Sequence, residues 1–369
     1  MTVRVGLIGA NGHGRWHRRR IAELAAGGAV RLVGLADPAP VEPAPDAPVF
    51  PDHRAMLAAV RPEVVVICTP PHTHLPIALD AVAAGCDLLL EKPPVLSLAD
   101  HEKLSAAIAA AGRACQVGFQ ALGSAALARL CTAVAGGELG PITAIATVAA
   151  WQRTDAYYRR AGWAGRGGVD GSLVNPLAHA VMQSLAVAAA AGAGDPVRLE
   201  AERYRVRPIE TDDTAFARIT FRGGLLLMAA VTLAAEEFIA GEVIVTGRAG
   251  QATLEYPTDR LRLPGTGLDV VPGRVDLLAN LLAHRRDRAG TPLLVPLSRT
   301  AAFTAFAEAL ITPGQPPPAR LDDRFVAVHG EPPDHVRIIP GITTVLRRSA
   351  QSRLLPSELG VAWAPAPRI

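Results

Sequence analysis

The chain has 369 residues, of which 50% are apolar and 19% are charged. This composition is typical of globular proteins, and the length predicts two domains rather than one small core. The formal net charge is +3, and arginines and acidic residues are interleaved without a basic stripe, so we expect no nucleic-acid partner.

The four cysteines form no Cys-x-x-Cys pair, which predicts neither a disulfide framework nor a zinc site. The remaining His, Cys and carboxylate residues also lack metal-ligand spacing, so we expect no metal. The first strand pattern begins at Val3, which leaves no room for a signal peptide. These features predict a cytoplasmic protein.

An uncharged stretch of 24 residues runs from Gly171 to Gly194. Its length suits a membrane span, but it contains Asn175, Pro176 and His179 among other polar residues and three glycines. A buried helix with a polar site at its start is therefore the better interpretation, and we expect no membrane partner.

Strand and helix patterns alternate over residues 1–121, as a doubly wound parallel sheet requires. Short apolar runs bounded by turn residues are typical of parallel strands that are buried on both faces. The expected strands are Val3–Ile8, Arg31–Ala36, Val64–Ile67, Asp87–Leu90 and Ala114–Gly118; the expected helices are Gly14–Ala26, His53–Val60, Leu75–Ala84 and Leu98–Ala111, with a loop over 38–51.

The pattern changes after residue 122. We expect an α+β domain over 122–318 with a large, mainly antiparallel open sheet, followed by a C-terminal extension over 319–369 that packs on it. Arg222-Gly223-Gly224 is a hairpin signal, and Pro313–Pro318 marks a break. The expected strands are Arg198–Arg207, Thr214–Phe221, Leu225–Thr232 and Glu242–Val245; the expected helices are Val275–Arg286, Thr300–Ile311 and Thr344–Ser352.

A glycine-rich turn, Gly9-Ala10-Asn11-Gly12-His13-Gly14, follows the first predicted strand and opens a helix. Such a turn lets a dinucleotide pyrophosphate approach the backbone at the helix N-terminus. Asn11 replaces the usual middle glycine, and asparagine tolerates left-handed backbone geometry. The alternative is a glycine-rich turn without a ligand.

Asp37 ends the second predicted strand, 23 residues after Gly14. A carboxylate at this place accepts the adenosine ribose hydroxyls and would repel a 2′-phosphate. The sequence therefore favours NAD over NADP as the cofactor.

Lys92 is one of two lysines in a chain with 35 arginines, and it lies in Glu91-Lys92-Pro93 at the end of an apolar run. Arginine stays protonated, whereas a partly desolvated lysine can exchange a proton. A titratable amine beside a dinucleotide turn suggests redox chemistry on an alcohol or carbonyl. The alternative is a surface lysine.

Five motifs in this order resemble the glucose–fructose oxidoreductase / inositol dehydrogenase / rhizopine catabolism (Gfo/Idh/MocA) family. They are Gly9–Gly14, Asp37, Thr69-Pro70 with His74, Glu91-Lys92-Pro93 and Val117-Gly118-Phe119-Gln120. The resemblance is looser in the second half, through Tyr157-Tyr158-Arg159, Trp163, Gly167-Gly168 and His179.

The resemblance implies a Rossmann domain, a second α/β domain whose open sheet forms a homodimer or homotetramer, and hydride transfer between nicotinamide and a sugar or cyclitol hydroxyl. It also implies the site. Besides the turn residues Gly9, Asn11, Gly12, His13 and Gly14, cofactor contacts would come from Asp37, Thr69, Pro70, His74, Glu91 and Gln120. Lys92 would bind the reacting oxygen and His179 would be the general acid/base; both roles suit alcohol oxidation. A satisfied core histidine is the alternative for His179.

Asn175 stands where the family usually has an aspartate, four residues before His179. An amide can orient His179 or bind a substrate hydroxyl, but it cannot relay a proton or raise the histidine pKa as a carboxylate does. Asn175-Pro176 would also serve as a helix N-cap and first-turn pair.

Tyr157, Tyr158, Trp163 and Arg166 form an aromatic and basic cluster in a chain with 4% aromatic residues. We assign substrate binding to Tyr157, Trp163 and Arg166, with a domain-interface role as the alternative. Three functions stay open: a net NAD-dependent oxidoreductase, a transient-redox enzyme that regenerates NAD during elimination, epimerisation or glycoside cleavage, and a non-catalytic NAD-binding regulatory protein.

Overall fold

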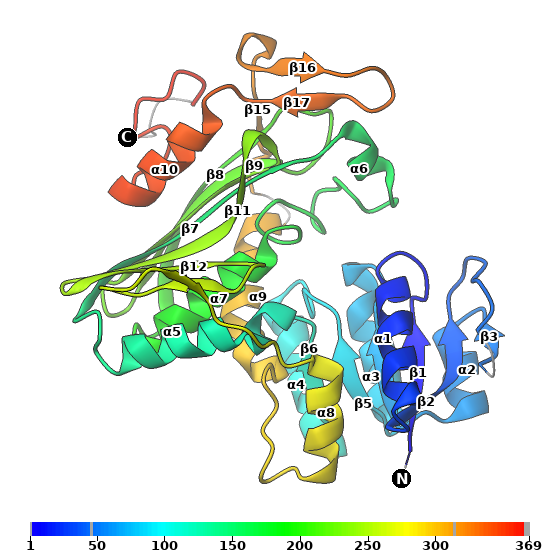
Figure 1. Cartoon of the computed structure of the whole chain (residues 1–369). Helices are drawn as coiled ribbons and strands as arrows, with labels where there is room; N and C mark the ends of the chain where they lie inside the picture. The colour runs from blue at the N-terminus through cyan, green and yellow to red at the C-terminus, as the bar shows by residue number, and fades with distance from the viewer. Residues whose placement is uncertain (1, 45–46, 313–314, 365–369) are drawn as a thin grey trace. The chain divides into compact units, whose positions relative to one another are not determined.

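The computed structural model describes residues 2–44, 47–312 and 315–364. The chain forms two compact units (Figure 1), and the chain enters the first unit twice. The first unit comprises residues 1–120 and 275–305, and the second comprises 121–274 and 306–369. The change near residue 120 lies beside the predicted boundary, but the return at 275–305 was expected within the second domain.

The first unit is built on a parallel sheet with the strand order β3-β2-β1-β4-β5-β6 over the described residues. The predicted Rossmann fold is confirmed. The strands are β1 Val3–Ile8, β2 Val30–Ala36, β3 Val49–Phe50, β4 Val64–Ile67, β5 Asp87–Leu90 and β6 Cys115–Val117; the helices are α1 Gly14–Ala26, α2 His53–Val60, α3 His74–Ala83 and α4 Leu98–Ala111, with short turns η1 Pro71–Thr73 and η2 Gln120–Gly123.

Local sequence explains most of these boundaries. Every residue of β4 and β5 is buried, which fits a strand covered on both faces. The Asp52 and Ser97 side chains accept hydrogen bonds from the amides of Ala55 and Asp100, and so cap α2 and α4. The short β3 lies inside the segment predicted as a loop; residues 45–46 of that loop lie outside the described chain.

The returning segment completes the first unit through α8, Leu277–Arg286, and the turn η3, Leu297–Thr300. The helix packs against β5 and β6. Gln116 of β6 donates to Asn280 Oδ1 at 2.6 Å and accepts from the Val295 amide at 2.9 Å. The fully buried Asp87 carboxylate contacts Arg285 and lies 3.4 Å from Arg288. Helical periodicity cannot say which sheet a helix packs on, so the sequence assigned α8 to the wrong unit.

The second unit is built on a large mixed sheet with the strand order β14-β13-β12-β11-β7-β10-β9-β8-β15 over the described residues. Neighbouring strands are antiparallel except β10 with β7 and β15 with β8, so the predicted sheet is confirmed. The strands are β7 Ile142–Gln152, β8 Pro196–Arg205, β9 Thr214–Phe221, β10 Leu226–Thr232, β11 Ala234–Gly247, β12 Gly250–Glu255, β13 Arg260–Arg262, β14 Leu268–Val270 and β15 Ala319–Arg320.

The two faces of this sheet are covered by different helices, because side chains alternate along β7. Thr147 bonds Ser184 of α7, Ala178–Ala190, at 2.5 Å. Its neighbours Ala146 and Val148 share a buried cluster with residues of α10, Ile342–Ser352. Figure 1 shows α10 on one side of the sheet and α5 and α7 on the other. The uncharged stretch is thus the buried α7, as predicted, and no described helix is long and apolar enough to cross a membrane.

The remaining elements are α5 Ala125–Ala135, α6 Asp155–Arg159, α9 Ala301–Ile311, the turn η4 Asp323–Phe325 and the hairpin of β16 Ala327–His329 with β17 Val336–Ile338. Part of the predicted break at Pro313–Pro318 and the last five residues of the tail lie outside the described chain.

Candidate functional site

The glycine-rich turn is packed so tightly that two of its glycines leave no room for a side chain. A Cβ atom on Gly14 would lie 1.9 Å from the Gly9 carbonyl oxygen, and one on Gly9 would lie 2.3 Å from the Cys68 carbonyl oxygen. Gly12 has a positive φ of 53°, and a Cβ there would meet nothing within 4 Å. The turn is therefore closed toward the sheet and open on its outer side, where a phosphate could approach.

Asp37 supports this turn from the end of β2. Its Oδ2 accepts the amides of Ala10 at 2.9 Å and Asn11 at 3.1 Å, and its Oδ1 accepts the Ala39 amide at 3.0 Å. The Asn11 side chain donates to the Pro40 carbonyl at 3.2 Å. The carboxylate thus fixes the turn, and it also places a negative charge at the expected ribose position.

Glu91 joins the turn to the carboxyl end of β5. Its Oε1 lies 2.9 Å from His17 Nε2 and 3.6 Å from His13 Nε2, and its Oε2 accepts the Lys92 amide at 3.1 Å. Burial favours the neutral acid, but hydrogen bonds from the two histidines outweigh burial and hold the Glu91 pKa well below its usual value. The side chain is therefore a carboxylate at neutral pH.

Gly118, after β6, leaves the space that the carboxylate of Glu91 fills: a Cβ there would lie 2.8 Å from that group. Lys92 is half-buried at the same strand end as Glu91. Cys68 follows β4 nearby, where burial and then the charge of Glu91 raise its thiol pKa, so it is a neutral thiol rather than a nucleophile.

His74 was expected beside the cofactor, but its side chain is fully buried. Its Nδ1 lies 2.8 Å from the Pro93 carbonyl oxygen and its Nε2 lies 2.9 Å from the Thr69 carbonyl oxygen. Burial lowers the His74 pKa, although the two carbonyls oppose this. The ring therefore ties Thr69-Pro70 to Lys92-Pro93 and acts as a structural link between two strand ends.

The expected ribose contacts Thr69 and Pro70 form a turn stabilised by Thr73, whose hydroxyl donates to the Pro70 carbonyl at 2.7 Å and lies 2.7 Å from the Thr69 hydroxyl. Gln120 is partly buried at the start of η2. A large pocket of about 880 Å³ lies elsewhere, along α1 toward the start of β2, and is lined by Arg15, Arg18, Arg19 and Arg31 among others. Ligands of such sheets bind outside the carboxyl ends of the strands, so we do not assign this pocket to the cofactor.

In the second unit, Asn175 is paired with a carboxylate. Its Nδ2 donates to Asp170 Oδ1 at 3.0 Å. Asp170 is buried and also accepts the amides of Gly165 at 2.8 Å and Gly171 at 3.0 Å. The start of α7 therefore combines an amide and an acid. Asn175 does not cap α7, because the residue before the helix is Leu177.

His179 lies in the first turn of α7 and is 6% exposed. Its ring stacks on Tyr256 with a centroid distance of 5.5 Å and an interplanar angle of 26°. Burial raises the Tyr256 pKa to about 12, so the phenol is neutral. The phenol ring thus packs against one face of the imidazole.

Tyr157 and Trp163 are occupied by arginine rather than exposed to solvent. The Arg160 guanidinium lies 3.6 Å from the Tyr157 ring centroid and 5.2 Å from that of Trp163. Arg166 is mostly exposed and lies 3.4 Å from Glu210. A cavity of about 270 Å³ is lined by Arg166 together with Tyr158, Arg207 and seven other residues. Of the three predicted substrate residues, Arg166 lines this cavity and Tyr157 and Trp163 do not.

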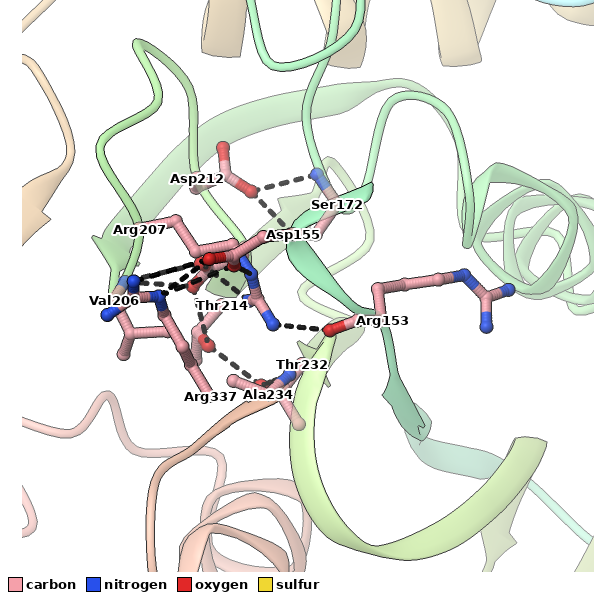
Figure 2. A network of polar contacts seen from close by, with 11 residues as sticks. Arg153, Asp155, Ser172, Val206, Arg207, Asp212, Thr214, Thr232, Ala234 and Arg337 are labelled. Atoms are coloured by element: carbon pink, nitrogen blue, oxygen red, sulfur yellow. Dashed lines mark hydrogen bonds and ion pairs between the residues drawn. The ribbon is translucent and has the colours of Figure 1, made fainter. Parts of the chain in front are cut away.

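A buried ionic network lies beside that cavity (Figure 2). Arg207 is 1% exposed and lies 3.1 Å from both Asp155 and Asp213, and it donates to the Arg153 carbonyl. Arg337 of β17 binds Asp155 at 3.2 Å. Burial raises the pKa of Asp213 to about 6 against the opposing effect of Arg207. The same network in Figure 2 includes Ser172, which donates to Asp212.

Sequence reasoning missed two of these features. His17 was not singled out, although its spacing of four from His13 places both on one side of α1. The Arg207 network had no signal, because Arg207 was expected to end a strand and the sequence does not indicate which acidic residues it contacts.

Comparison with known proteins agrees with this geometry. Residues 3–119 match the model of the GFO_IDH_MocA oxidoreductase family, described as an NAD-binding Rossmann fold. An inositol 2-dehydrogenase of Paracoccus denitrificans is 33% identical over 125 residues, 32% of this chain and 37% of the relative. A D-glucoside 3-dehydrogenase of Escherichia coli is 44% identical over 52 residues, 14% of this chain and 15% of the relative. The sequence similarity thus spans 37% of the first relative and 15% of the second.

Solved structures resemble the whole fold. The WlbA dehydrogenase of Bordetella pertussis, in complex with NADH and UDP-GlcNAcA, has a TM-score of 0.72 at 23% identity over 87% of this chain and 100% of the other. An inositol dehydrogenase homolog of Azotobacter vinelandii, with NADH and myo-inositol, has a TM-score of 0.69 at 16% identity over 84% and 95%. The resemblance inferred from the motifs is confirmed: residues 3–119 match the Gfo/Idh/MocA family model with its NAD-binding Rossmann fold.

Proposed function

We propose that the protein is an NAD(H)-dependent oxidoreductase that acts on a hydroxyl or carbonyl group of a sugar, a cyclitol or a derivative. The observation that carries the proposal is the convergence of the glycine-rich turn, Asp37 and Glu91-Lys92 at the carboxyl ends of β1, β2 and β5. This is the edge at which parallel sheets bind dinucleotides. The names of the similar dehydrogenases support the same substrate class.

The turn fits a dinucleotide. The close packing of Gly9 and Gly14 fixes the backbone, and the open space at Gly12 leaves its outer side accessible. Asp37 would accept a ribose hydroxyl and repel a 2′-phosphate, so NAD is favoured over NADP. When bound, NAD supplies the hydride acceptor for alcohol oxidation.

We assign the proton chemistry to Lys92 and His179. During oxidation the carbon–hydrogen bond breaks as hydride leaves, the hydroxyl proton passes to His179 Nε2 or Nδ1, and the carbon–oxygen double bond forms. Lys92 donates a hydrogen bond to the oxygen as negative charge develops on it. Stacking on Tyr256 holds the imidazole ring in place.

Asn175 makes the histidine side of this site unusual. Its Nδ2 donates to Asp170, and we assign its Oδ1 to binding a substrate hydroxyl or orienting His179. This arrangement orients hydrogen bonds without adding a charge beside the imidazole. It is also compatible with the transient-redox alternative. In that reaction a proton is removed from carbon and NAD is regenerated, so there is no net oxidation.

The test is NADH formation, followed by absorbance, with NAD and a panel of cyclitols, aldoses, amino sugars and sugar acids. Lys92→Met should lower turnover about 100- to 10,000-fold and leave NADH binding intact. Lys103→Met is the matched control, since Lys103 is the only other lysine and is exposed on α4; it should behave as wild type.

Product analysis separates the alternatives. Consumption of a sugar without NADH accumulation would establish transient redox. Tight NADH binding with no substrate conversion across the panel would favour the regulatory protein. Failure to bind NADH or NADPH at millimolar concentration would contradict all three.

We also propose a cytoplasmic homodimer or homotetramer. A groove of about 590 Å³ runs between β11, β12 and α10 and is lined by Glu242, Glu255, Arg262, Arg347 and Arg353 among others. Light scattering of the purified chain would measure the oligomeric state, and a monomer at micromolar concentration would contradict this proposal.

A further inference from the structure

We propose that His13, His17 and Glu91 form a binding site for one divalent transition-metal ion of the zinc type, at the opening of the glycine-rich turn. The inference goes beyond the proposed hydride transfer, because His13 and Glu91 are shared with the proposed dinucleotide site, whereas His17 and a bound ion are not part of it. It rests on the positions of three ligand-type side chains that all belong to the first unit.

The distances suit a metal. In a tetrahedral site with ligand bonds of about 2.0–2.1 Å, the ligand atoms lie about 3.3 Å from one another. Here Glu91 Oε1 lies 2.9 Å from His17 Nε2 and 3.6 Å from His13 Nε2, and all three ligand atoms lie within 4.8 Å of one another. Shifts of a few tenths of an ångström would bring the two pairs with Glu91 to this spacing, and metal binding would draw the two histidine nitrogens together from within 4.8 Å.

The backbone arrangement holds the three side chains in place. His13 is the N-cap residue of α1 and His17 lies one turn later, so both point to the same side of the helix. Their rings stand at 82° with centroids 5.3 Å apart. Trp16 stacks in parallel on His13, with the centroids 5.7 Å apart. The Lys92 amide holds Glu91 Oε2, which leaves Oε1 directed at the histidines.

The donor set selects the ion. Two imidazoles and one carboxylate suit zinc, cobalt or nickel, whereas magnesium and calcium prefer oxygen ligands alone. Three protein ligands leave a fourth position for water or for an oxygen of another molecule. The His13 side chain is 54% exposed while the other two are nearly buried, so this fourth position faces solvent on the His13 side.

The outer coordination shell is incomplete. His17 Nδ1 is buried and contacts no acceptor among the described residues. A ligating histidine usually donates its second N–H to such an acceptor, and losing one weakens metal affinity by about 10- to 100-fold. We therefore expect a site that exchanges its ion readily and is emptied by chelators.

The position couples the metal to the dinucleotide turn, because His13 lies between Gly12 and Gly14. A phosphate bound at the start of α1 would either supply the fourth ligand or compete with the ion for space. Coupling of either sign must be reciprocal, so the metal affinity should change when NADH is present.

The experiment uses the full chain without a histidine tag, stripped with a chelator and titrated with Co²⁺ and then Zn²⁺. We expect one equivalent of Co²⁺ with the intense visible bands of tetrahedral coordination, no thiolate-to-cobalt absorption, and displacement by Zn²⁺. His13→Ala should weaken binding at least tenfold. His72→Ala, which removes an exposed histidine of the same unit, should leave it unchanged.

The result that would overturn the proposal is the absence of stoichiometric Co²⁺ binding, or equal binding by wild type and His13→Ala. His13 is exposed, so its replacement should not prevent folding; Glu91→Gln, which keeps the shape of the carboxylate, provides a second variant with the same expected loss. NADH binding by the metal-free protein is measured separately, so failure of the metal site and failure of the proposed redox function give different results.

Discussion

The two units differ in whether the polar side chains of their candidate sites stand singly or are bound to one another. In the first unit the candidate site is made of backbone turns and single side chains at the ends of β1, β2, β4 and β5. In the second unit many of the charged and aromatic side chains near α6 and α7 are bound to one another, as in the buried network around Arg207 (Figure 2). A strand end in a parallel sheet is thus a good guide to a site, whereas a cluster of functional residue types is not.

The largest effect is expected in the first unit, where the Gly9–Gly14 turn is closely packed. Gly14→Ala places a Cβ 1.9 Å from a backbone carbonyl, so the turn must open and NADH binding should be lost. Gly12→Ala is the matched control; it meets no atom and strains only the left-handed backbone, at a cost of about 1–2 kcal/mol. Fluorescence titration with NADH measures both variants. Equal affinities would show that the turn does not bind the dinucleotide.

The buried network should matter for stability rather than for the cofactor. Arg207→Met leaves the Asp213 and Asp155 carboxylates buried without their shared partner, and we expect a loss of about 3–5 kcal/mol. Arg198→Met breaks an exposed pair with Glu200 and should cost about 1 kcal/mol or less.

Urea unfolding of these two variants is followed by tryptophan fluorescence in a Trp16→Phe background. The other three tryptophans, Trp151, Trp163 and Trp363, all lie in the second unit, so the signal reports that unit alone. A small effect of Arg207→Met would mean that the network is not a stabilising element.

The two units should respond to acid in opposite directions. The folded pKa of Asp213 is raised to about 6, so its contribution to stability is fully present below its unfolded pKa of 3.8 and is lost as pH rises through about 6. The folded pKa of Glu91 is lowered, so its contribution is present above 4.5 and is lost as pH falls. Asp213→Asn should flatten the first dependence, by about 1–3 kcal/mol, and Glu91→Gln should flatten the second.

Unfolding free energies between pH 2 and 7, with the tryptophan probe for the second unit and Trp16 for the first, test this. Infrared absorption of a protonated carboxyl that disappears in Asp213→Asn would identify the group directly. Unchanged pH profiles in both variants would contradict the assigned shifts.

The smallest effect is expected at Asn175, which makes a hydrogen-bonded pair with Asp170 at the start of α7. Asn175→Asp would place two carboxylates about 3 Å apart, raise the pKa of one of them and destabilise the start of α7 by about 1 kcal/mol at neutral pH. The double variant Asp170→Asn/Asn175→Asp exchanges the two groups and should recover part of the loss. A double-mutant cycle on unfolding free energy measures the coupling, and additive effects would exclude it.

Sequence patterns predicted the first unit well because each apolar run there is short, buried and bounded by turn residues. The bounds of β1, α1, α2, β4, β5 and α4 agree with the structure. The long β7 was missed although the strand signal was present, because Ile142–Gln152 contains five β-branched residues and a tryptophan beside its four alanines.

The parts of the site that the sequence could not provide are tertiary contacts. The Gly9–Gly14 motif, Asp37 and Glu91 were identified from their places after strands. The hydrogen bonds of Asp37 to the turn, the contact of His74 with Pro93 and the contacts of Glu91 with two histidines join segments that lie 19 to 78 residues apart. The partners of Tyr157 and Asn175 lie close in sequence, but residue type alone did not distinguish a bound side chain from an available one.

The late return of the chain to the first unit has a consequence for synthesis. On the ribosome, residues 1–120 emerge long before Arg285 and Arg288 are made. During that time Asp87 of β5 lacks both arginine partners, and the sheet lacks helix α8. The nucleotide-binding half therefore matures only after most of its neighbour has been translated. For the same reason, a fragment cut near residue 121 would be an incomplete domain, and linking 1–120 to 275–305 would be the natural way to isolate it.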